Sequence, residues 1–221
     1  RGRNQQLSVG GSIGARDSYG IGFSDPWMFG NHVSLDLGLG RTFFEHLFLD
    51  QSVASSDVHF RLGRWYGEHV KMMIGTGLEQ KKFSNSFDTL SFSYIKPQWS
   101  IAYDTRDIFW NPGRGFYFLN FFYMMLDRTN EEKSALIWRQ SYSTFIPLGS
   151  NPKKLVLAMN ITAHRRWSGK HDVWLKYFGG SYSVRGWPLP DRGSYSPSRQ
   201  SFRFGHEYVH ASLELRKDII P

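Results

Sequence analysis

Residues 33–40 read Val-Ser-Leu-Asp-Leu-Gly-Leu-Gly, and every second residue in this stretch is apolar. Successive side chains of a β-strand point to opposite faces, so this spacing predicts a strand with one apolar and one polar face. The polar face carries serine, aspartate and glycine, whereas lysine, glutamate and threonine are expected on a sheet face that meets water. The stretch therefore predicts β structure and raises the question of what surrounds it.

The same alternation recurs along most of the chain, with turn-forming residues between the segments. The further alternating segments are residues 7–14, 58–62, 90–94, 99–104, 155–162 and 209–216. No segment of ordinary helix length shows an apolar period of 3.6, and the sequence contains no internal repeat or low-complexity linker. The chain is therefore predicted to be one all-β domain of about ten antiparallel strands.

Two architectures would give this alternation. A soluble sandwich or small barrel turns its apolar face inward, whereas a transmembrane β-barrel turns it toward lipid and lines its lumen with small or polar residues. The serine and glycine on the polar faces, and segments longer than ten residues, favour the transmembrane barrel. Aromatic residues also gather near the expected strand ends, as in an interfacial girdle: Trp27, Phe29, Trp65, Tyr66, Phe109, Trp110, Trp167, Tyr177 and Phe178. A soluble β protein is the alternative.

Composition excludes several other classes. No apolar run approaches the roughly 18 residues of a spanning helix, and the mean hydropathy is −0.43. The chain has no cysteine, which excludes disulfide frameworks and thiolate metal sites. The net charge of +8 comes from scattered cations, so we expect no nucleic-acid partner. His206 and His210 would lie about 13 Å apart on one strand face, so we expect no metal and no cofactor.

The stretch Val184-Arg185-Gly186-Trp187 lies in a segment too long to be a simple hairpin turn. A loop arginine in solvent beside a turn glycine is the plainest interpretation. The alternating segments on either side suggest a different setting, inside a barrel, where the guanidinium would need a partner.

Three stretches together resemble the outer-membrane insertase and transporter superfamily typified by BamA, the bacterial surface antigen barrels. They are residues 178–187 (FGGSYSVRGW), residues 103–115 (YDTRDIFWNPGRG) and residues 23–30 (FSDPWMFG). The first is similar to the sixth extracellular loop signature of that family, with Trp187 at a position that usually holds Phe or Tyr. The branch could be that of BamA, of TamA or of the two-partner secretion transporters.

The resemblance implies that the loop folds back into the barrel and that its arginine binds acidic residues of the inner wall. Strand parity places Glu214 on the same face as Ser212 and His210, the face expected to line the lumen. An Arg185–Glu214 pair would satisfy both charged groups and hold the loop against the wall. In the family, a second acidic wall residue would lie beyond Pro221.

Asp104, Arg106 and Asp107 are open to two interpretations. Paired carboxylates around an arginine can serve acid–base chemistry. The alternative, which we favour, is a strand-end turn in which the carboxylates accept backbone N–H bonds and Pro112 and Gly115 shape the return. No serine or histidine stands near them in sequence as a nucleophile or base, so we expect no catalytic residue.

The resemblance also implies that residues 1–221 are a partial barrel domain. Residues 7–15 would match about the third strand of a sixteen-stranded barrel, and the segment ending at Leu215 about the twelfth. The POTRA domains that precede such barrels and the closing strands would lie outside this chain. Since open sheet edges do not persist in lipid, we expect these residues to be part of a larger whole.

The function implied by the resemblance is folding and insertion of client β-barrels into a bacterial outer membrane, without nucleotide. The implied partners are the outer-membrane bilayer, unfolded β-barrel clients and accessory assembly lipoproteins. An organelle outer membrane is the less favoured location. The alternatives are a TamA-like or two-partner secretion transporter and, from another class, a passive porin or a barrel enzyme.

Overall fold

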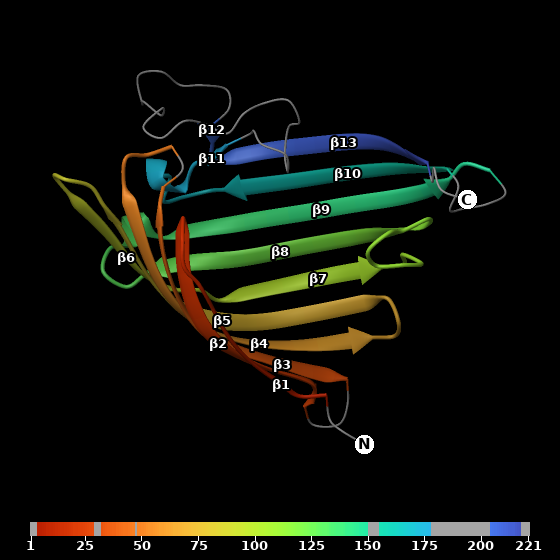
Figure 1. Ribbon diagram of the computed structural model, residues 1–221, viewed down its shortest axis with the longest axis horizontal. Helices are drawn as coiled ribbons and strands as arrows, with labels where there is room; N and C mark the ends of the chain where they lie inside the picture. The colour runs from red at the N-terminus through yellow and green to blue at the C-terminus, as the bar shows by residue number, and fades with distance from the viewer. Residues whose placement is uncertain (1–3, 29–31, 47, 150–154, 178–203, 218–221) are drawn as a thin grey trace.

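The computed structural model describes residues 4–28, 32–46, 48–149, 155–177 and 204–217. Eleven of its strands form one antiparallel sheet, which curves into an open trough (Figure 1). Among these residues, no helix is long and apolar enough to cross a bilayer.

The main sheet comprises the following strands: β1 (Gln6–Ser12), β2 (Arg16–Met28), β3 (Val33–Glu45), β4 (Ser52–Tyr66), β5 (Val70–Ser84), β6 (Thr89–Ile95), β7 (Gln98–Asp104), β8 (Gly115–Asp127), β9 (Ala135–Pro147), β10 (Leu155–Arg166) and β13 (Glu207–Lys217). A separate two-stranded pair joins β11 (Lys176–Tyr177) to β12 (Phe204–Gly205). Two short 3₁₀ helices complete the described elements: η1 (Glu131–Lys133) and η2 (Asp172–Trp174).

Strands β6 and β7 are two halves of one crossing of the sheet. β6 pairs with the second half of β5, from Leu78 to Ser84, whereas β7 pairs with its first half, from Val70 to Gly75. Counted this way, the eleven strands make ten crossings, so the prediction of an antiparallel barrel sheet of about ten strands is confirmed.

The connections gather at two ends of the trough, which we call the loop end and the terminal end. The described ends of the 40-residue connection 167–206 lie at the loop end, together with the described parts of the shorter connections 46–51, 85–88 and 128–134. The first and last described residues, Asn4 and Lys217, lie at the terminal end, as do the connection 105–114 and residues 148–149 (Figure 1). The turn 104–115 and the described ends of the connection that contains residues 184–187 thus lie at opposite ends.

The outer face of the sheet is apolar over its middle. On β13, Val209 is 72% exposed and Leu213 68% exposed, while His210, Ser212 and Glu214 lie on the more covered inner face. Large aliphatic side chains left this exposed on a regular sheet face require an apolar surrounding. The inverted alternation agrees with the predicted transmembrane barrel.

The strand at residues 89–95 departs from the expected orientation. Phe92 and Tyr94 are almost fully buried on the inner face, and Ser91 and Ser93 lie on the outer face. The expectation that apolar residues of every segment face lipid was therefore wrong here. On the neighbouring β5, the outer face changes from Leu78 to polar side chains at Gln80 and Lys82, so the sheet leaves the bilayer near this level and its outer face meets water.

Candidate functional site: the inner wall

Glu214 lies on the inner face of β13, directly opposite Ala158 of β10. Arg216, two residues further along the same strand, donates from Nε to the Glu214 carboxylate at 3.2 Å. A carboxylate has two oxygens and can accept from more than one cation. Nearby on the same wall, Asn160 donates to Ser143 Oγ at 2.7 Å.

The stretch Val184, Arg185, Gly186 and Trp187 lies outside the described residues. The described beginning and end of its connection meet at the loop end, where β11 pairs with β12. The Phe48 ring from the β3–β4 connection packs edge-on against Tyr177 at 5.6 Å and Phe204 at 4.8 Å between centroids. The long connection is therefore anchored to the opposite side of the trough at both its beginning and its end.

An apolar cluster, which we call the cap cluster, fills the inside of the trough at the loop end. Its buried members come from five strands and from η2: Val53, Phe83, Phe92, Tyr94, Met125, Ala135, Ile137 and Val173. The Trp174 ring of η2 packs on it, at 5.5 Å from Phe83 and 5.4 Å from Phe92. The first part of the long connection thus crosses the inside of the sheet and fastens β4–β6 to β8 and β9.

Two cations contact the Trp174 ring. Lys81 Nζ lies 4.9 Å and the Arg166 guanidinium carbon 5.0 Å from its centroid. Arg166 is only 3% exposed and donates from Nε to the Gly169 carbonyl at 2.8 Å. Cation–π contacts strengthen when they are withdrawn from water. Through these two contacts, Trp174 links the cap cluster to the charged inner wall.

We expect replacement of Trp174 by alanine to loosen the cap cluster and raise ion flow through the lumen. The change removes the ring that joins the two sides and leaves Lys81 and Arg166 without their aromatic contact. The measurement is single-channel conductance of the full-length protein in planar bilayers. Trp167→Ala is the matched control, because Trp167 is 41% exposed and outside the cluster. Equal conductance of both variants and the unaltered protein would contradict a sealing role.

The 104–115 turn begins with a two-residue ion pair. Arg106 donates to both oxygens of Asp104, from Nε at 2.9 Å and from Nη2 at 2.7 Å, and its guanidinium lies 4.6 Å from the Tyr117 ring centroid. This bidentate, stacked arrangement fixes the arginine geometrically. The guanidinium of Arg106 is occupied by Asp104 and by the Tyr117 ring, which suits a structural turn better than acid–base chemistry.

Asp107 closes the turn through the backbone. Its Oδ1 accepts N–H bonds from Ile108 at 2.9 Å, Gly113 at 3.0 Å and Arg114 at 3.4 Å. Burial raises the pKa of Asp107, but the N–H groups of Gly113, Arg114 and Ile108 outweigh it, so the pKa lies below its usual value. Pro112, before Gly113, is buried within the turn.

We expect Asp107→Ala to lower the free energy of unfolding by about 1 to 2 kcal/mol at neutral pH, because three N–H groups lose their acceptor. A depressed pKa means that the ionised carboxylate stabilises the fold above the unfolded-state pKa of about 3.9, and that this stabilisation is lost as the pH falls through the folded-state value. Urea unfolding at several pH values should therefore show the difference shrinking on acidification below about pH 4. A pH-independent difference would show that the charge of Asp107 plays no part.

Gly115 occupies a position that no other residue fits. Its φ of +99° lies in a region that L side chains rarely adopt, and a Cβ there would lie 2.3 Å from the Thr105 carbonyl oxygen. The close approach follows from a tight bridge: Phe116 N donates to Thr105 Oγ1 at 3.0 Å, and Thr105 N donates to the Phe116 carbonyl at 2.9 Å. Gly115 is thus required where the pairing of β7 with β8 continues into the turn.

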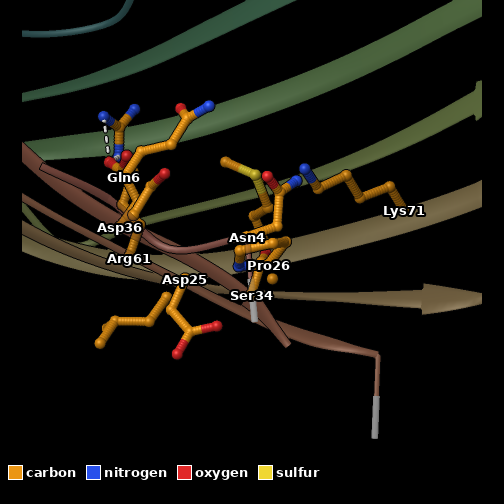
Figure 2. Close-up of a pocket in the computed structure, with 12 residues that line it drawn as sticks. Asn4, Gln6, Asp25, Pro26, Ser34, Asp36, Arg61 and Lys71 are labelled. Carbon is orange, nitrogen blue, oxygen red and sulfur yellow. Dashed lines mark hydrogen bonds and ion pairs between the residues drawn. The ribbon is translucent and has the colours of Figure 1, made fainter. Parts of the chain in front are cut away.

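The inner wall of β3 and β4 carries a charged group that the sequence did not single out. Asp36 accepts from Arg61 Nε at 2.8 Å and lies 3.0 Å from His59 Nε2. Figure 2 shows Asp36 and Arg61 beside a hollow of about 390 Å³ that Lys71 borders from β5. Alternation places Asp36, His59 and Arg61 on the polar faces of their strands. Only the pairing of β3 with β4 brings these three side chains together.

A second charged group lies closer to the loop end. Glu79 of β5 lies 3.0 Å from Lys96 Nζ and 3.6 Å from Lys81 Nζ, and Ser55 Oγ donates to it at 3.4 Å. Paired charges therefore line much of the inner surface of the trough, from this group to Asp36, Arg61 and Glu214. A polar, charged interior behind an apolar outer belt defines a membrane-spanning β-barrel wall.

Comparison with known proteins agrees with this class. Residues 1–221 match the Omp85 superfamily domain, and the chain belongs to that superfamily. This membership agrees with the predicted outer-membrane β-barrel. A search of curated proteins finds no match.

Among solved structures, the chain is similar to BamA from Haemophilus ducreyi lacking POTRA domains 1–3, with a TM-score of 0.80 and 19% sequence identity. The alignment covers 96% of this chain and 47% of that chain, so the present chain spans about half the length of the solved structure. At this identity the likeness shows the shared fold. It confirms the predicted partial barrel of the BamA type.

Proposed function

We propose that the protein containing this chain folds and inserts client β-barrels into the bacterial outer membrane. The observation that carries the proposal is the inner wall itself. The described beginning and end of a 40-residue connection are anchored inside the loop end, and the wall carries paired charges that include Glu214. Superfamily membership over residues 1–221 supports it. The work requires no nucleotide, cofactor or catalytic residue, and accessory lipoproteins are proposed as further partners.

In this proposal Arg185 pairs with Glu214 and holds the long connection in the lumen. Chain length allows the contact. From Tyr177 to Arg185 the backbone can span at most about 27 Å, and the seven residues from Glu207 to Glu214 cover about 24 Å along β13. The shorter arm of the connection would have to run nearly straight down the wall. Glu214 would then accept from both Arg185 and Arg216.

We also propose where this chain lies in the whole protein. Residues 1–221 form the middle of a sixteen-stranded barrel, with POTRA domains before it and closing strands beyond it. The open edges of β1 and β13, each of which has one neighbour among the described strands, fit such an arrangement.

The second candidate is a transporter of the TamA or two-partner secretion kind. The charged hollow beside Asp36, Arg61 and Lys71 favours it, because a polypeptide in transit would need a polar path along the wall. A passive porin fits less well, since the cap cluster fills the lumen at the loop end.

Reconstitution of the full-length protein in liposomes separates the two candidates. Unfolded client barrel is added outside the vesicles and its folding is followed by heat-dependent gel mobility, in parallel with protease protection of a non-barrel polypeptide offered to the same vesicles. The proposal predicts faster folding of the barrel and no uptake of the other polypeptide. Uptake without accelerated folding would favour the transporter instead.

A further inference from the structure

Two carboxamides lie side by side on the lipid-facing surface of the barrel. Asn120 of β8 and Gln140 of β9 are direct cross-strand partners. They share the outward face with Phe122, Trp138 and Ile146, the last of which is 48% exposed. Apolar side chains are expected on this face, so the pair is unusual for its position.

The depth of the pair follows from strand register. One continuous row of cross-strand partners crosses the sheet from β5 to β13: Met72, Ile101, Asn120, Gln140, Ala163 and Val209. It begins near the terminal end of β5 and finishes near the loop end of β13, so its centre lies near the middle of the apolar belt. The other four members are all apolar.

Only part of the hydrogen-bonding capacity of the pair is used. Trp138 Nε1 donates to Asn120 Oδ1 at 2.7 Å. In the described part of the chain, the amide nitrogen of Asn120 and both polar atoms of the Gln140 side chain have no further hydrogen-bond partner. Acyl chains cannot supply one, and unmet polar groups in hydrocarbon are costly.

We propose that two copies of this protein associate in the membrane through this patch, with the carboxamides of one copy bonded to those of the other. Copies in one membrane share orientation and depth, so a two-fold axis along the membrane normal brings each level of one barrel against the same level of its partner. A carboxamide is both donor and acceptor and is therefore complementary to itself.

The surroundings of the pair suit a protein partner. Trp99 stacks on Phe122 with centroids 5.0 Å apart, and Phe122 lies 6.4 Å from Trp138. These rings extend the patch over β7, β8 and β9 as a broad apolar surface with the two amides at its centre. Within a membrane, polar side chains can form hydrogen bonds between associating segments. The surrounding apolar contacts would shield such bonds from water here. The inference does not depend on the client-insertion proposal.

Site-directed crosslinking tests the proposal. Residues 1–221 contain no cysteine, so Gln140→Cys can be introduced into the full-length protein with any cysteine elsewhere replaced by serine. A short bismaleimide is applied to proteoliposomes at high lipid dilution. We expect dimers from Gln140→Cys and none from the control Ile74→Cys, which is 64% exposed on the outer face of β5. Equal crosslinking at both positions, or none at either, would overturn the proposal.

A second measurement addresses the amide itself. Gln140→Leu keeps the approximate size of the side chain and removes its carboxamide. We expect this change to raise the dissociation constant of the dimer in vesicles by about tenfold or more. Energy transfer between labelled copies measures that constant. Thr76→Val, another lipid-facing change on β5, should leave it unaltered. Heat-dependent gel mobility verifies that each variant folds. A dimer constant unchanged by Gln140→Leu would contradict a role for the carboxamides.

Discussion

Arg185→Ala is expected to reduce client insertion by about tenfold or more and to lower the folding yield of the barrel itself. In the proposed arrangement the change removes one member of a charge-assisted pair with Glu214, and hydrogen bonds to charged groups contribute about 1.5 to 3 kcal/mol each. Without it, the long connection has no proposed hold on the wall below the cap cluster. Insertion of an unfolded client into proteoliposomes measures the first effect and heat-dependent gel mobility the second.

The controls for Arg185 come from the same chain. Arg192→Ala removes an arginine of the same connection and should leave insertion and folding unchanged. Glu214→Gln should reproduce the loss, and combining it with Arg185→Ala should add little, because paired residues show non-additive effects. Full additivity of the two changes would show that Arg185 and Glu214 act separately.

Gly115→Ala is expected to destabilise the barrel by about 3 kcal/mol or more. The new Cβ would meet the Thr105 carbonyl oxygen at 2.3 Å and its carbonyl carbon at 2.8 Å, and neither backbone atom can move without opening the bridge to Phe116. The positive φ adds strain of its own. Urea unfolding of the full-length protein in vesicles measures the loss.

Two other glycines separate the clash from the strain. Gly67 has a φ of +64° and no atom within 4 Å of an added Cβ, so Gly67→Ala should cost only the strain, about 1 to 2 kcal/mol. Gly10 has neither a positive φ nor a close neighbour, so Gly10→Ala should be near neutral. If Gly115→Ala proved no worse than Gly67→Ala, the close approach at Thr105 would not be a constraint.

The residues that share one face of a strand could be predicted from the sequence, because side chains alternate strictly with a period of two. Glu214, Asp36 and Arg61 all lie on the inner face that alternation assigns to them. The class of fold followed from what those faces carry. The turn at Asp104–Gly115 was also predictable, since its carboxylates and glycine act on neighbours within a few residues.

The partners across strands could not be predicted in the same way. Asp36 and Arg61 are 25 residues apart, and a shift of one residue between β3 and β4 would separate them. Nor could alternation tell which face of a strand is the inner one: Phe92 and Tyr94 turn inward and pack in the cap cluster. The cap cluster combines residues from six elements, which no local pattern links.

The most direct test of the insertase function is the rate at which an unfolded client barrel becomes folded in liposomes that contain the full-length protein. The measurement compares unaltered protein, Arg185→Ala and protein-free liposomes of the same lipid. We predict clear acceleration by the unaltered protein and a rate close to that of protein-free liposomes for Arg185→Ala. Equal rates in all three would contradict the insertase function, and full acceleration by Arg185→Ala would contradict the proposed hold of Arg185 on the inner wall.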